Sequence, residues 1–97
     1  MKRYVLTNAA IEDLDNIWDY SAEVWSVDQA DKYVGEIRAV CEAIARGDAT
    51  GRPADEIRAG YRKAAVRSHI LFFHTSGDGT IEIVRILHQR MDISLHL

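Results

Sequence analysis

Two amphipathic helical patterns follow one another around Ser26 with almost no linker between them. Asn8 can cap the first helix, and the apolar residues that follow recur at helical spacing. They are Ile11, Leu14, Ile17, Trp18, Ala22 and Trp25. Ser26 and Gln29 form a capping-box pattern that starts the second helix, and Gly47 can end it in a left-handed conformation. Helices joined this closely must fold back on each other, so the sequence predicts an antiparallel helix hairpin.

The periodicity changes from helical to strand-like after a long connection at 47–60, which contains the only proline. Strands are predicted over 61–66, 68–75 and 80–88, and an earlier one over 2–6. The last three strands are consecutive and should form an antiparallel meander with an apolar face for the helices to cover. We therefore expect an α+β fold in the order β-α-α-β-β-β, with the hairpin packed on an antiparallel sheet.

Length and composition predict a single domain over residues 1–97. A chain of 97 residues is too short to divide between two cores, and no stretch approaches the roughly 18 apolar residues of a membrane span. The apolar stretch after Lys2 and Arg3 is too short for a secretory signal. Cys41 is the single cysteine, as in many proteins of a reducing compartment. We therefore expect a cytoplasmic protein without membrane contact.

The charge distribution favours a protein partner over nucleic acid. A net charge of −3 argues against a stand-alone nucleic-acid binder, which needs clustered basic side chains. Residues 1–46 carry five basic and nine acidic side chains, whereas residues 47–97 carry seven basic and six acidic. Only three of the twelve basic residues are lysines. Because planar arginine forks suit carboxylates, the basic second half predicts an acidic protein partner.

The strand-like run from Ile81 to Leu87 is interrupted by Arg85. A guanidinium in such a run is costly unless it is paired or reaches water, so we expect Arg85 where the sheet opens to a partner. A meander could bring Arg85 together with other side chains that bind a phosphate or transfer a proton, the two roles that RNA cleavage requires. These are Arg58, Tyr61, Arg62, Arg67, His88 and Arg90. A docking surface for an acidic peptide and a solvated sheet face remain alternatives. Arg85 and His88 are three residues apart and face oppositely on a regular strand, which weakens the nuclease interpretation.

The remaining conspicuous residues favour structural roles. Trp18 and Trp25 lie on the apolar side of the first helix, and we expect both in the core. Cys41 lies on the apolar stripe of the second helix and is interpreted as a small core residue. His69 and His74 should point to opposite faces of one strand, so no metal site is predicted. No glycine-rich phosphate loop follows a strand, and no cofactor is expected.

Four segments resemble the ParE toxins of bacterial toxin–antitoxin modules, within the RelE/ParE superfamily. They are Ala10-x-x-Asp13-Leu14-x-x-Ile17-Trp18-x-Tyr20, Gly60-Tyr61-Arg62, Ser68-His69-x-x-Phe72-Phe73 and Ile83-x-Arg85-Ile86-Leu87-His88-Gln89-Arg90-Met91-Asp92. The resemblance implies the RelE/ParE-like fold and a cytoplasmic toxin without catalytic residues of its own. It also implies neutralisation by a ParD-like antitoxin, a ribbon-helix-helix protein with an acidic tail, through which promoter DNA is contacted only indirectly.

The ParE branch implies DNA gyrase as the target. The alternative is a ribosome-dependent mRNA endoribonuclease of the RelE type, but this chain is acidic, has one lysine in its second half and has no tyrosine after Tyr61. A module acting mainly in transcriptional co-regulation with its antitoxin is a third class. The antitoxin-binding residues are predicted to be Arg58, Tyr61, Arg62, Arg67 and Arg85. The residues for toxicity or target binding are predicted to be His88, Arg90 and Met91.

Overall fold

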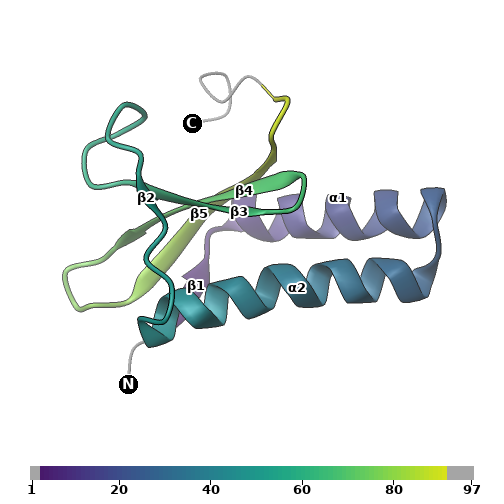
Figure 1. Ribbon diagram of the computed structural model, residues 1–97, viewed down its shortest axis with the longest axis horizontal. Helices are drawn as coiled ribbons and strands as arrows, with labels where there is room; N and C mark the ends of the chain where they lie inside the picture. Colours follow the sequence, from purple (N-terminus) through teal and green to yellow (C-terminus); the bar gives the residue numbers. More distant parts are fainter. Residues whose placement is uncertain (1–2, 92–97) are drawn as a thin grey trace.

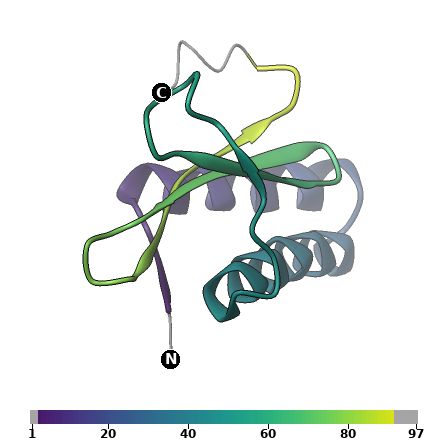
Figure 2. The same cartoon turned by 60° about the vertical axis from the view of Figure 1, so that its left-hand side comes forward.

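A five-stranded sheet and a helix hairpin form the two layers of the computed structural model, which describes residues 3–91 (Figure 1). The elements follow in the order β1 (Tyr4–Leu6), α1 (Asn8–Val24), α2 (Val27–Arg46), β2 (Arg52–Pro53), β3 (Arg62–Val66), β4 (His69–Thr75) and β5 (Ile81–His88). Both helices lie against the same face of the sheet (Figure 2). The predicted α+β order of strand, helix hairpin and meander is confirmed. The first strand is shorter than expected, and its predicted start at Lys2 lies outside the described residues.

Capping residues set the two ends of α2 and the start of α1. Thr7, rather than Asn8, is the N-cap of α1: its hydroxyl accepts a hydrogen bond from the Ala10 amide at 3.1 Å and donates one to the Val84 carbonyl at 2.7 Å. The prediction of Asn8 was wrong because Thr7 can join the helix start to the sheet as well as cap it. Ser26 caps α2 through the Gln29 amide at 3.0 Å, and Gly47 ends it at φ 83°, as predicted.

The sheet has the strand order β1-β5-β4-β3-β2 and is mixed rather than purely antiparallel. The meander of β3, β4 and β5 is antiparallel, as expected. The two helices carry the chain back across the sheet, so β1 pairs with β5 in parallel, with Tyr4 opposite Ile81. The short strand β2, which lies in the predicted connection, adds an antiparallel edge to β3.

A bulge in β5 decides which of its side chains face the helices. Phe73 is paired with Ile83 and Phe72 with Arg85, which leaves position 84 without a cross-strand partner. The alternation therefore shifts by one residue along the strand. Ile81 and Ile83 before the bulge and Ile86 after it all join the core under the hairpin. His88, two residues after Ile86, returns to the same face and pairs with His69.

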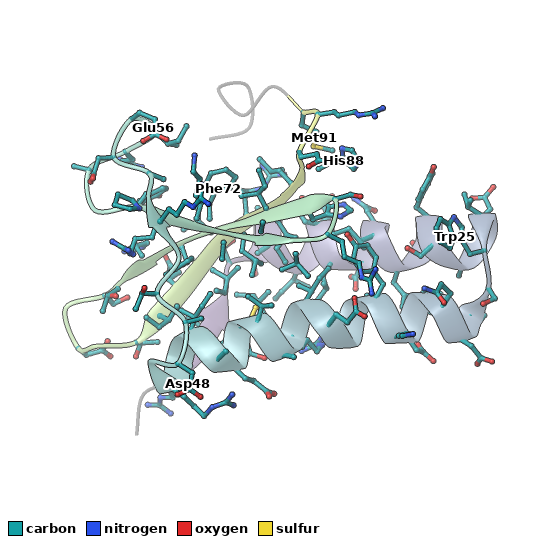
Figure 3. The ribbon with its side chains drawn as sticks, viewed as in Figure 1. Trp25, Asp48, Glu56, Phe72, His88 and Met91 are labelled. Carbon is teal, nitrogen blue, oxygen red and sulfur yellow. The ribbon has the colours of Figure 1, made fainter. Side chains whose placement is uncertain are left out.

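The core lies between the hairpin and the sheet, and it ends before the tip of the hairpin. Ile37, Cys41, Leu71 and Ile83 are almost completely buried there. Trp25, which we expected in the core, is 69% exposed, because the helices extend past the sheet and no other part of residues 3–91 covers their tip (Figures 1 and 3). Trp18 is half-buried, and its indole nitrogen donates to Asp31 at 2.8 Å. Within residues 3–91, neither helix is long and apolar enough to cross a membrane.

Candidate functional site

A groove of about 570 Å³ lies between the helix hairpin and the far end of the meander. Both helices contribute to it, together with the turn between β3 and β4 and the end of β5. Its apolar lining consists of Ile17, Tyr20, Trp25, Tyr33, Ile86 and Met91. Figure 3 shows His88 and Met91 at the end of β5 and Trp25 near the tip of the hairpin. A groove with this lining can accept an apolar segment of another molecule.

The mouth of the groove exposes large apolar side chains. Tyr20 is 66% exposed, Trp25 is 69% exposed and Met91 is 45% exposed. Val24 and Val27 continue this apolar surface around the tip of the hairpin, each slightly more than half exposed. An apolar surface that surrounds a groove is typical of a protein-binding site. Aromatic and methionine side chains are also enriched where proteins bind each other.

One wall of the groove is fixed by an ion pair between α1 and β5. The Asp13 carboxylate accepts two hydrogen bonds from the Arg85 guanidinium, both at 2.8 Å, and a third from the Ile86 amide at 3.0 Å. Both side chains are largely buried, and this bonding raises the pKa of Arg85. The expectation that Arg85 lies where the sheet opens to a partner stays a prediction. Its charge is paired within the chain, at the β5 edge that β1 leaves uncovered.

The rim of the groove carries a second, exposed ion pair. Arg67, in the turn between β3 and β4, donates from Nε and one terminal nitrogen to the two carboxylate oxygens of Glu36, at 2.5 and 2.9 Å. The Arg67 side chain is 64% exposed. The guanidinium lowers the pKa of Glu36 by hydrogen bonding to its charged form. Exposed pairs of this kind contribute little to stability, so Arg67 can exchange Glu36 for another carboxylate at low cost.

The floor of the groove holds a cluster of Tyr33, His69 and His88. The Tyr33 hydroxyl lies 2.5 Å from His69 Nδ1 and 3.3 Å from the Val66 carbonyl. The rings of His69 and His88 meet edge to face with centroids 5.2 Å apart. Burial raises the pKa of Tyr33, and burial together with the neighbouring His88 lowers the pKa of His69. The groove therefore favours the neutral form of both Tyr33 and His69.

Only three of the eight predicted binding residues line the groove: Arg67, His88 and Met91. Arg62 donates to the carbonyls of Thr50 at 2.6 Å and Gly51 at 3.1 Å, and so holds the connection before β2. Tyr61 stacks on His74, with ring centroids 5.4 Å apart.

The other three predicted binding residues, Arg58, Arg85 and Arg90, are also absent from the groove lining. Arg58 is exposed in the connection between β2 and β3. Arg90 is exposed after β5, and its backbone amide donates to His88 Nδ1 at 3.1 Å. Asp13, which pairs with Arg85, lines the groove. The eight residues therefore form no single cluster.

Within residues 3–91, the other residues considered for metal binding or reactivity have structural roles. His74 bonds to Glu82 at 2.8 Å on the sheet face opposite His69, as the strand alternation predicted. No group of three or more histidine, cysteine or acidic residues within 3–91 could hold a metal ion. Cys41 is buried, and burial raises its pKa to about 11, so its thiol stays protonated at neutral pH.

The groove residues that sequence reasoning missed include Asp13, Tyr20, Tyr33 and His69. Asp13 and Tyr20 lie in the helix segment that carries the family resemblance, and their place in that segment was the available signal. Tyr33 lies on the apolar stripe of the second helix, and His69 lies in another segment that carries the resemblance, but the only role considered for its side chain was that of a metal ligand. Their meeting depends on contacts between residues 36 positions apart, which linear spacing does not reveal.

A model of the ParE toxin of type II toxin–antitoxin systems (parDE) matches residues 4–93 of the sequence. The chain belongs to the ParE toxin family. It is 46% identical over 95 residues to toxin ParE1 of Mycobacterium tuberculosis, covering 98% of this chain and 97% of the relative. It is 43% identical over 97 residues to toxin ParE1 of Caulobacter vibrioides, covering 100% and 99%.

A solved structure supports the same family. The chain is similar to one from a structure described as the chromosomal ParDE toxin–antitoxin system from P. aeruginosa, with a TM-score of 0.76 and 25% sequence identity. The match covers 91% of this chain and 95% of the other. The RelE/ParE-like α+β fold expected from the resemblance is therefore confirmed for this ParE family member.

Proposed function

We propose that this ParE family toxin is kept inactive by a ParD-like antitoxin that binds directly in the groove between the hairpin and the meander. Released from the antitoxin, the toxin inhibits DNA gyrase in the cytoplasm and catalyses no reaction itself. The antitoxin is a ribbon-helix-helix protein with an acidic tail, and promoter DNA is contacted through it alone. The similarity to a chain from a ParDE complex supports an antitoxin partner.

The observation that carries the antitoxin proposal is the exposed aromatic mouth of the groove. Tyr20 and Trp25 expose large apolar side chains to solvent beside Met91. Apolar surface in contact with water is unfavourable in free energy, and a partner that covers these side chains removes that cost. Arg67 lies at the rim with most of its side chain exposed, and a carboxylate of an acidic tail can replace Glu36 there. Arg58, Tyr61, Arg62 and Arg85 stay predictions as antitoxin contacts.

The pairing of Arg85 supports a toxin without nuclease chemistry. RNA cleavage by the predicted arginine and histidine residues needs a guanidinium that stabilises the phosphate, next to a histidine that transfers the proton. The Asp13 carboxylate accepts two hydrogen bonds from the Arg85 guanidinium, and the strand register places Arg85 and His88 on opposite faces of β5. This arrangement favours target binding over catalysis.

Replacing Trp25 tests the groove as the antitoxin site. The probe is the full-length ParD-type protein encoded beside the gene, and its affinity is measured by titration calorimetry. Trp25→Ala removes an exposed aromatic anchor and should weaken binding by about 2 kcal/mol, or roughly thirtyfold. The free toxin should keep its melting temperature, since exposed side chains contribute little to the fold.

Ile11→Ala is the matched control. Ile11 is 47% exposed on the same helix but does not line the groove. Its replacement should leave the affinity within about twofold of the wild type, because an exposed position outside the groove loses little when truncated. Equal affinities for wild type and Trp25→Ala would place the antitoxin elsewhere.

Expression without antitoxin tests the target. We expect filamentous cells with a DNA-damage response, intact mRNA on translating ribosomes, and gyrase trapped on cleaved DNA by the purified toxin. His88→Ala should weaken gyrase trapping if His88 contributes to target binding. Codon-specific mRNA cleavage that disappears in His88→Ala would reject the gyrase proposal and restore the ribonuclease alternative.

A further inference from the structure

Two histidines occupy the floor of the groove, directly opposite each other across the β4–β5 pair. His69 and His88 are register partners, and their rings meet at 5.2 Å. Backbone and side-chain groups orient both rings: His69 Nδ1 bonds to the Tyr33 hydroxyl, and His88 Nδ1 accepts from the Arg90 amide. Histidine is the side chain whose charge changes nearest to physiological pH.

The other ionisable groups around the histidine pair already have partners. From α1, Asp13 faces it and is paired with Arg85 of β5. From α2, Glu36 is paired with Arg67 of the β3–β4 turn, and Tyr33 is neutral at physiological pH like any tyrosine, with burial raising its pKa further. Arg90 follows His88 and contacts it through its backbone amide. Near neutral pH, the charge of the groove floor is therefore set mainly by the two imidazoles.

We propose that the His69–His88 pair makes antitoxin binding in this groove pH-dependent, with tight binding when both imidazoles are neutral and weaker binding when either is protonated. The inference rests on the proposed function and adds a means of regulation to the same site. An acidified cytoplasm would then loosen the complex and release toxin.

The direction of the effect follows from desolvation. An apolar segment that covers Ile17, Ile86 and Met91 also removes water from the histidines beside them. Loss of water disfavours the charged imidazole and lowers its pKa further. Burial and the neighbouring His88 already lower the pKa of His69 in the free toxin. Binding must therefore release protons when the free histidines are partly protonated, and affinity must fall as the pH falls.

The test is titration calorimetry of the toxin with the full-length ParD-type protein encoded beside its gene. Measurements at about pH 7.5 and about pH 5.5 bracket the ordinary histidine pKa. Affinity should fall several-fold at the lower pH, because the full tenfold loss expected when binding lowers one histidine pKa by about one unit is reached only below both the free and the bound pKa. Near pH 6, buffers with different ionisation enthalpies should reveal net release of protons on binding.

Two variants assign the effect to the histidine pair. His69→Gln combined with His88→Gln should bind at about pH 5.5 nearly as well as at about pH 7.5, because neither position can then become charged. His74→Gln is the matched control, since His74 is a histidine of β4 on the opposite sheet face, bonded to Glu82. It should keep the wild-type pH dependence. Thermal melts of each free variant check that it is folded under the binding conditions.

The outcomes separate this inference from the proposed function. Tight binding that is equal at both pH values, or a pH dependence that survives in the double histidine variant, overturns the inference and leaves the antitoxin proposal standing. Absence of binding at both pH values overturns both. Proton uptake on binding would also overturn the inference, because it would mean that the partner stabilises charged imidazoles.

Discussion

The Asp13 carboxylate holds Arg85 and the backbone amide of Ile86 together, and so ties helix α1 to the edge of β5. This contact joins residues 72 positions apart. It caps the part of the β5 edge that lies beyond the end of β1, where an unpaired strand would otherwise be exposed.

Asp13→Ala should destabilise the protein more than Arg85→Ala does. Removing the carboxylate takes two hydrogen bonds from a largely buried guanidinium and one from the Ile86 amide, which should cost about 3 to 4 kcal/mol. Removing Arg85 leaves Asp13 its bond to the Ile86 amide, so the cost should be nearer about 2 kcal/mol. Urea unfolding of both single variants and the double variant gives the coupling energy. A larger loss for Arg85→Ala would contradict this assignment.

Gly51→Ala should cost far more than Gly47→Ala, although both glycines have positive φ. A Cβ at Gly51 would collide with the Lys63 carbonyl oxygen and lie 3.2 Å from the Phe73 ring. Gly47 has no atom within 4 Å of that position, so its replacement meets only the backbone strain of about 1 kcal/mol. We expect about 3 kcal/mol or more for Gly51→Ala from strain and collision combined. Equal unfolding midpoints of the two variants would refute the close approach.

Gly35→Ala should stabilise the toxin. Gly35 is exposed in the middle of α2, and nothing lies within 4 Å of a Cβ added there. Alanine loses less backbone entropy on forming a helix, which should add about 0.5 to 1 kcal/mol to the free energy of unfolding. Thermal melting measures the gain. A decrease in stability would indicate that the α2 backbone is strained at this residue.

The free energy of unfolding should decrease as the pH falls below the ordinary histidine pKa of 6.5. Burial, followed by the neighbouring His88, lowers the pKa of His69 in the folded state. Below pH 6.5 the unfolded chain therefore binds more protons than the native one, and stability falls until the folded-state pKa is passed. Urea unfolding at several pH values should show this loss in the wild type and a smaller one in His69→Gln. Identical pH profiles would exclude His69 as its source.

The sequence alone determined the order of the elements, because its determinants are local. Helical and strand periodicities depend on neighbouring residues, and the caps at Ser26 and Gly47 form within a single turn. The meander followed from three strand patterns separated by short turns. The resemblance to ParE toxins was likewise visible in contiguous segments, and the family match confirms it.

Only the tertiary structure decided which residues make the groove. The sequence placed Trp25 in the core because its position continues an apolar stripe, yet α1 extends past the sheet and leaves it exposed. The bulge at position 84, where the pairing with β4 shifts by one residue, places His88 on the helix side. Arg85 found its partner 72 positions away in Asp13. These outcomes depend on how far the helix hairpin overlaps the sheet and on how the strands align with one another. Neither can be read from local periodicity.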